Sequence, residues 1–203
     1  MKRCAWRVHR LADELVKGIY WANGKGCAIG CLAETGIAPH KALEDQISVP
    51  RTILFLVDRI FEGMSNERSM EWPEAFILAI KPGANLAHVI DQFMVWMLAN
   101  EEAGVVRFAH EDGKQAIAQV VALYQRRLAG ETVEASAWLE ARRVARSAAA
   151  DADAYAAAYA AAADAAAAAY AYADAARKKH FAAMRDMLLK LLQDAPVAEE
   201  SNA

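Results

Sequence analysis

The sequence predicts an all-α protein, a multi-helix bundle with a long alanine-rich helical hairpin at its C-terminal end. Residues 154–176 consist only of alanine, tyrosine and aspartate. Alanine has the highest intrinsic helix propensity, and this tract offers the backbone no competing turn or strand. Residues 132–194 contain neither glycine nor proline. Because no part of the chain shows a convincing alternation of apolar and polar residues, we expect no sheet.

The N-terminal half is expected to contain short helices around an irregular segment. Apolar residues near helical spacing predict a helix over residues 4–17. Glycines and prolines make residues 18–50 the least regular part of the chain, with a helix start near Cys27. Pro50 suits the first turn of a helix whose apolar face continues to Gly63.

The later helices have start and stop signals of the usual kinds. A polar capping residue or a proline precedes each apolar run, and a glycine follows the last of them. These signals predict helices that begin near Asn66, Trp72, Asn85 and Asp112, with a stop at Gly130.

The segment from Thr132 to Asp194 is too long for one straight helix in a compact domain. A continuous helix would extend roughly 95 Å, whereas a compact chain of this length has a radius of gyration of about 17 Å. We expect a fold-back between Ser147 and Asp151, where arginines end one helix and aspartates begin a second one of about 28 residues. The apolar stripe at 184–192 then packs on the core or on a partner.

Two parts follow from this organisation. Residues 1–130 are expected to form a helical core that contains the glycine-rich loop. Residues 131–203 are expected to form an alanine-rich helical segment that packs on this core or on a second subunit. A chain of 203 residues is long enough for one domain with such an extension.

Composition narrows the classes of partner. The net charge is −3 and the isoelectric point is near 6.0, so no global charge favours nucleic acid or an anionic membrane. The alanine tract is interrupted by aspartates and is too weakly apolar for a membrane span, and the N-terminus lacks the apolar core of a signal peptide. With three cysteines in no framework spacing, we expect a cytoplasmic protein with reduced thiols.

The passage from Tyr20 to Cys31 has the greatest potential for binding. Its glycines permit close backbone approach, and Lys25 adds positive charge near the expected helix start, a combination that attracts anions. Two adjacent aromatic residues could stack on a base. The alternative is a structural turn anchored by Trp21. The candidate ligand-binding residues in this passage are Tyr20, Trp21, Asn23, Gly24, Lys25, Gly26 and Cys27.

Residues of the long helices complete the candidate site. Tyr155, Tyr159 and Tyr170 fall on one face of the alanine-rich helix at 100° per residue. They either pack as the only large side chains of a tight bundle helix or stack on a flat ligand. Arg143 belongs to a set of basic residues that would form a phosphate-binding rim if two helices are antiparallel.

The cysteines and carboxylates leave other interpretations open. Cys27 and Cys31 are four residues apart and could bind zinc with Cys4, His9 or His40, but small buried thiols explain them as well. Cys27 could also be a nucleophile at a helix start. Asp58 and Glu62, on one helix, either form ion pairs that hold the next loop or supply polar groups to a pocket. We therefore predict no catalytic residue and no metal site.

Several motifs together resemble an uncharacterised family found in phages and bacterial genomes. They are the run from Ala12 to Gly18, Tyr20-Trp21, the run from Gly24 to Cys31, the run from Asp58 to Gly63, Trp72-Pro73-Glu74 and the run from Ile80 to Leu86. Members end in alanine-rich helices, as this chain does, so the resemblance covers most of its length. The chain departs from the family at Leu32–Gln46, where His40 is the one histidine. The resemblance implies a small phage-linked accessory protein in the host cytoplasm, a class that often counters host defence.

These observations favour a non-enzymatic binding protein, with no cofactor, that captures a small anionic, nucleotide-like ligand. The alternative is a helical interaction module that binds itself or a host protein through the alanine-tyrosine helix or residues 184–192. An enzyme that uses Cys27, Asp58 or Glu62 is a third interpretation. We expect a homo-oligomer and neither nucleic acid nor a membrane as partner.

Overall fold

The computed structural model describes residues 14–160 and 166–197, and the side chains of residues 14–147 and 176–197. Within these ranges the chain is mainly helical and forms no strand, which confirms the predicted all-α class. The chain divides into two compact units. One contains the residues up to Ile90 and those from Arg177 onward, and the other is Asp91–Ala176. The predicted boundary near residue 130 does not coincide with this division.

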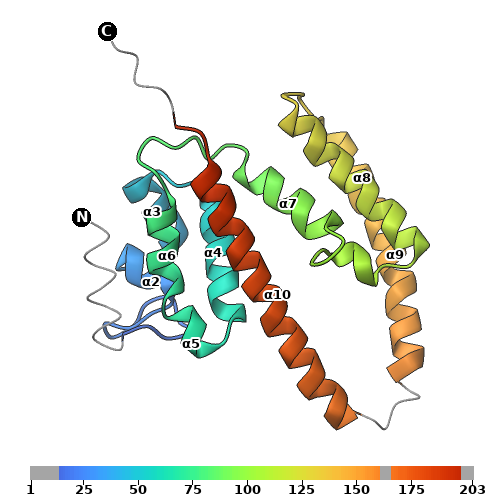
Figure 1. The fold of residues 1–203 in the computed structure, drawn as a ribbon, viewed down its shortest axis with the longest axis horizontal. Helices are drawn as coiled ribbons and strands as arrows, with labels where there is room; N and C mark the ends of the chain where they lie inside the picture. Colours follow the sequence, from blue (N-terminus) through green and yellow to red (C-terminus); the bar gives the residue numbers. More distant parts are fainter. Residues whose placement is uncertain (1–13, 161–165, 198–203) are drawn as a thin grey trace. The chain divides into compact units, whose positions relative to one another are not determined.

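The first unit is built around three helices that contact one another (Figure 1). Pro50 precedes the first residue of the longest of them, as the sequence predicts, and the apolar face of that helix is buried. The helices of this part of the chain are α2 (Ala28–Ala33), α3 (Pro39–Ile47), α4 (Arg51–Gly63), α5 (Asn66–Ser69) and α6 (Trp72–Ala79). Helix α3 lies inside the segment that the sequence analysis expected to be irregular.

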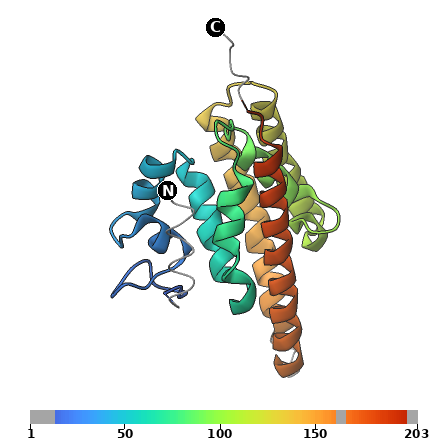
Figure 2. The same ribbon diagram turned by 60° about the vertical axis from the view of Figure 1, so that its left-hand side comes forward.

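Two further helices contact α4, in addition to α2 and α3. The indole of Trp72, at the start of α6, donates a hydrogen bond to the carbonyl oxygen of Val57 at 3.0 Å. The C-terminal part of α10 (Ala166–Asp194) runs beside α4 in both views (Figure 2). A Cβ atom added to Gly63 would lie 2.3 Å from the ring of Phe181, so glycine permits this close approach.

The apolar stripe at 184–192 is part of the molecule's own core. Met184, Leu188 and Leu192 are buried. Pro196 follows the end of α10, and its carbonyl oxygen accepts a hydrogen bond from the amide of Asn85 at 2.7 Å. Of the two interpretations left open for this stripe, packing on the core is therefore confirmed, and the stripe does not provide a free docking face.

The second unit contains a helical hairpin. Helices α8 (Glu111–Leu128) and α9 (Ala135–Ala160) run side by side (Figure 1), with Gly130 at a positive φ of 84° between them. The rings of Tyr124 and Trp138 pack edge to face, with 4.9 Å between their centroids. A short 3-10 helix, η1 (Val105–Phe108), precedes α8, and α7 (Val89–Ala99) begins at the boundary with the first unit.

Three expectations about the ends of helices are wrong. Residues 14–17 of the predicted first helix are not helical, because Leu15 forms a backbone bridge with Gly26; residues 4–13 of that prediction lie outside the described range. Helix α9 passes without interruption through the predicted fold-back at 147–151. The predicted second helix does not begin at Asp151, because α9 is continuous from Ala135 to Ala160; residues 161–165 of that prediction lie outside the described range.

Arg143 shows why a fold-back was wrongly predicted at residues 147–151. It was expected near the end of a helix, but its guanidinium pairs with Glu140, one turn earlier on the exposed surface of α9. Such pairs form in the middle of helices as readily as at their ends. None of the helices in the described ranges is both long and apolar enough to cross a bilayer.

Candidate functional site

The glycine-rich passage forms a tight hairpin. Asn23 and Gly24 have φ angles of 53° and 78°, and two successive positive φ values are what a type I′ turn requires. Residues Ala22 and Lys25 exchange both backbone hydrogen bonds across the turn, at 2.8 and 3.0 Å. The Asn-Gly pair is the strongest short-range sequence signal for this turn, and the sequence analysis gave it no weight.

Three amides that follow the turn, those of Lys25, Gly26 and Cys27, are already paired inside the protein. The N–H of Lys25 donates to Ala22, that of Gly26 to the carbonyl of Glu14 at 2.9 Å, and that of Cys27 to the carbonyl of Ile19 at 2.7 Å. An anion site made from these three donors would have to break the bonds that hold the hairpin closed. The expectation that this passage binds an anion therefore cannot rely on these three amides.

Two glycines allow the backbone at Tyr20 to lie against the start of α2. A Cβ atom on Gly26 would be 2.0 Å from the carbonyl oxygen of Tyr20, and one on Gly30 would be 1.4 Å from the same atom. No side chain fits in either place. The glycines of this motif thus serve close packing of two backbone segments, which brings Tyr20 and Cys27 to one side of the hairpin.

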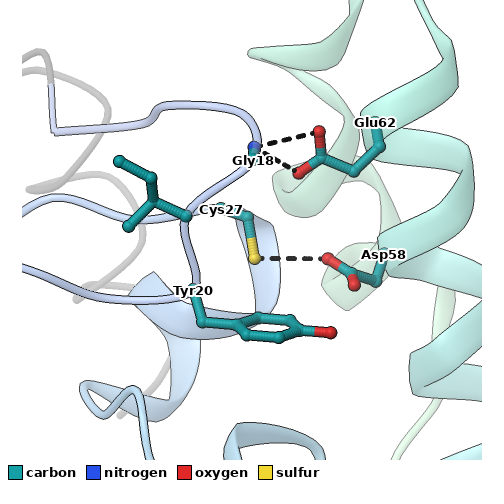
Figure 3. A pocket seen from close by; sticks show the side chains of 6 residues that line it. Gly18, Tyr20, Cys27, Asp58 and Glu62 are labelled. Atoms are coloured by element: carbon teal, nitrogen blue, oxygen red, sulfur yellow. Dashed lines mark hydrogen bonds between the residues drawn. The ribbon is translucent and has the colours of Figure 1, made fainter.

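A pocket of about 290 Å³ lies on that side, between the hairpin and α4. Figure 3 shows the side chains of Tyr20, Cys27, Asp58 and Glu62 directed toward it. Asp58 and Glu62 are four residues apart on α4, so both lie on the same face of that helix. Gly18 and Ile19 complete the lining.

The polar atoms of the pocket are close together. The thiol of Cys27 donates to Oδ1 of Asp58 at 3.2 Å, and the amide of Gly18 donates to both carboxylate oxygens of Glu62 at 3.0 and 3.1 Å (Figure 3). One ligand atom from each of Cys27, Asp58 and Glu62 lies within 4.8 Å of the others. Among the described residues, this cluster is one that could hold a metal ion.

The thiol of Cys27 is kept neutral at physiological pH. Burial, followed by the charge of Asp58, raises its pKa to about 12, although the amide of Gly30 acts in the opposite direction. The thiolate is the reactive form of cysteine. The interpretation of Cys27 as an activated nucleophile therefore finds no support in its surroundings.

His40 adds a buried imidazole behind Asp58. The residue is 5% exposed, and its ring stacks on Phe55 with a centroid distance of 4.1 Å and meets the edge of Tyr20 at 5.5 Å. Its Nε2 atom lies 3.6 Å from Oδ2 of Asp58 and has no hydrogen-bond partner among the described residues. Burial lowers the pKa of His40, so the ring is neutral at physiological pH.

Lys17 lies near Glu62, one of the two acids. Lys17 interacts electrostatically with Glu62, which opposes the lowering of the Lys17 pKa by burial. Its ammonium group donates to the carbonyl oxygen of Met64. Lys17 does not line the pocket, so Asp58 and Glu62 are the charged groups that do.

The structure brings together only part of the predicted ligand-binding set. Tyr20 and Cys27 line the pocket, whereas Trp21, Asn23, Gly24, Lys25 and Gly26 belong to the hairpin and do not. The remaining three lie on α9 in the second unit: Arg143 pairs with Glu140, and the side chains of Tyr155 and Tyr159 lie outside the described part.

Asp58 and Glu62 have the role that the sequence analysis held as its alternative, as polar groups of a pocket. Cys31 is excluded from the cluster because its sulfur is directed to the carbonyl oxygen of Gly26, at 3.3 Å. The proximity of His40 to Asp58 depends on the packing of α3 against α4, and no local pattern predicts it.

Comparison with family models, curated proteins and solved structures finds no match to this chain.

Proposed function

We propose that this protein is a binding protein whose pocket beside Cys27 takes a small, positively charged ligand. The main support for this proposal is the negative charge of the pocket. Among the residues that the structure describes, its charged lining residues are the acids Asp58 and Glu62, and the thiol between them and the hairpin is neutral. Two carboxylates on one face of a helix repel each other, and a cation placed between them removes that repulsion.

This proposal reverses the sign of the ligand expected from the sequence. An anionic, nucleotide-like ligand needs free backbone donors or basic side chains, and the amides of Lys25, Gly26 and Cys27 are already paired inside the protein. A phosphate at the pocket would also meet both carboxylates, and like charges at such short range are unfavourable.

The size and walls of the pocket limit the ligand further. A volume of about 290 Å³ is at the lower end for small-molecule sites, which span roughly 300–1,000 Å³. Ile19 and Tyr20, which line it, are 50% and 45% exposed. The ligand is therefore a metal ion or a compact organic cation, and in the second case the Tyr20 ring can contact it through its π-face.

A thermal-shift panel on the full-length, chelator-treated protein tests the proposal. The panel contains divalent metal ions, organic ammonium and guanidinium compounds, and linear and cyclic nucleotides. We expect at least one cation to stabilise the fold, by about 2.7 kcal/mol at 100 times its Kd. Asp58→Asn should remove this response because it halves the charge at the pocket.

Glu67→Gln is the matched control, since Glu67 is an exposed acid on α5 and does not line the pocket. It should respond like the wild type. Stabilisation by a nucleotide and by no cation would contradict the proposal. It would favour the anionic ligand that the sequence predicts. No response from any cation would also contradict it.

A further inference from the structure

We propose that Cys27, Asp58 and Glu62 bind one divalent ion of the zinc type, with His40 holding Asp58 in position. This inference rests on the proposed function and assigns its ligand.

The spacing suits a small four-coordinate ion. Zinc binds cysteine sulfur at about 2.3 Å and carboxylate oxygen at about 2.0–2.2 Å, so two ligands of a tetrahedral site lie roughly 3.5 Å apart. The sulfur of Cys27 lies 3.2 Å from Oδ1 of Asp58. The three ligand atoms all lie within 4.8 Å of one another, so small rotations of side chains bring them to one ion.

The ligand types favour zinc over magnesium or calcium. Magnesium and calcium take oxygen ligands almost exclusively, whereas a sulfur ligand selects a softer ion. Cys27 is 1% exposed and its sulfur faces the two carboxyls rather than the apolar core alone. An organic cation would gain nothing from a thiol at this position, whereas zinc binds the sulfur as a thiolate and the Cys27 proton is released to solvent.

His40 provides the second, independent observation. A buried nitrogen without a hydrogen-bond partner is costly and rare, and it indicates a group or a rearrangement that satisfies it. Nε2 of His40 lies 3.6 Å from Oδ2 of Asp58, the carboxylate oxygen that does not accept the thiol. If Oδ1 binds the ion, a small shift of the carboxylate lets Oδ2 accept a hydrogen bond from Nε2. Outer partners of this kind orient metal-binding carboxylates.

The site is open on its fourth side. Three protein ligands leave one position of a four-coordinate ion for water or for a donor atom from the pocket. Gly18, Ile19 and Tyr20 line that side, and two of them are about half exposed. The arrangement therefore fits an ion that is reached from solvent rather than one sealed in a core.

Cobalt substitution of the full-length, metal-free protein tests this inference. We expect Co²⁺ to bind in a 1:1 ratio and to produce the absorption of a cobalt–thiolate bond, and Zn²⁺ to displace it. Cys27→Ser should remove this absorption. Asp58→Asn and Glu62→Gln should each raise the Kd for Zn²⁺ at least about tenfold. Far-ultraviolet circular dichroism checks that each variant keeps its helices. If Cys27→Ser unfolds, the Kd values of Asp58→Asn and Glu62→Gln for Zn²⁺ test the site instead.

Matched controls isolate the site. Cys31→Ala and Cys4→Ser should keep the cobalt–thiolate absorption. His40→Phe, which keeps a ring to stack on Phe55, should weaken Zn²⁺ by about tenfold without loss of that absorption, and His40→Gln should weaken it less because its amide can donate to Asp58.

The outcomes separate this inference from the proposed function. Absorption that persists in Cys27→Ser, or a failure of both Co²⁺ and Zn²⁺ to bind, overturns the metal site. In the second case, stabilisation by an organic cation that depends on Asp58 leaves the proposed function intact. A protein that responds to neither class of cation overturns both.

Discussion

Cys27 joins the two structural parts of the site, because its backbone belongs to the hairpin and its thiol contacts α4. Its N–H is fixed by the carbonyl of Ile19 and its sulfur donates to Asp58. The same burial that orders this thiol makes its ionisation unfavourable. Cys31, one turn later, is in a similar state, since burial raises its pKa to about 12 as well.

Alkaline pH should therefore destabilise the metal-free protein. The pKa of each thiol is higher in the folded chain, about 12, than its ordinary value of 9.0. The unfolded chain releases these protons first, so the contribution to stability is complete below pH 9 and is lost as the pH rises from 9 toward 12. Urea unfolding at several pH values should show this fall in the free energy of unfolding.

Cys31→Ala is the matched variant for this measurement. It removes one of the two titrating thiols and leaves the pocket unchanged, so the free energy of unfolding should fall less steeply with pH than in the wild type. Equal slopes for the two proteins would mean that the Cys31 thiol does not contribute in this way.

At the scale of elements, the hairpin and α2 fit together only because glycine is present at two contacts. The sequence makes the glycines obvious but not their purpose, since a loop that binds phosphate and a loop that packs tightly use the same residue. Asn23-Gly24 distinguishes the two, because this pair favours a type I′ turn in which the flanking residues Ala22 and Lys25 exchange backbone hydrogen bonds.

Gly30→Ala should destabilise the first unit. Its new Cβ would lie 1.4 Å from the carbonyl oxygen of Tyr20, so α2 or the backbone at Tyr20 must move. Overpacking typically costs about 1–3 kcal/mol, more than the roughly 1 kcal/mol that alanine gains over glycine in a helix. Urea unfolding should show a net loss of stability together with weaker cation binding.

Gly113→Ala is the control for this change. Gly113 lies in α8, and its added Cβ would have the methyl group of Ala109 as its nearest neighbour, at 3.1 Å. The gain in helix propensity should offset this contact, so stability should change little. A Gly30→Ala protein as stable as this control would mean that the two backbone segments do not pack as described.

At the scale of the whole molecule, the sequence predicts the helical class and several helix starts, because propensity and capping are local properties. Pro50 before α4 and Trp72 at the start of α6 are examples. The uninterrupted course of α9 through residues 147–151 was not predicted, since arginines followed by aspartates are typical of a helix end and a new helix start. The convergence of Cys27, His40 and Asp58 was not predicted either, because it arises from packing among α2, α3 and α4.

Other predictions stay at the level of the sequence. Self-association, the phage-linked family and a role against host defence are not tested by any feature of the described residues.

The most direct measurement is a crystal structure of the full-length protein grown with Zn²⁺, with anomalous diffraction collected on both sides of the zinc absorption edge. We predict one strong anomalous peak within bonding distance of Cys27 Sγ and of a carboxylate oxygen from each of Asp58 and Glu62. A structure with zinc bound only elsewhere, and with the Cys27 thiol still paired to Asp58, would contradict the account.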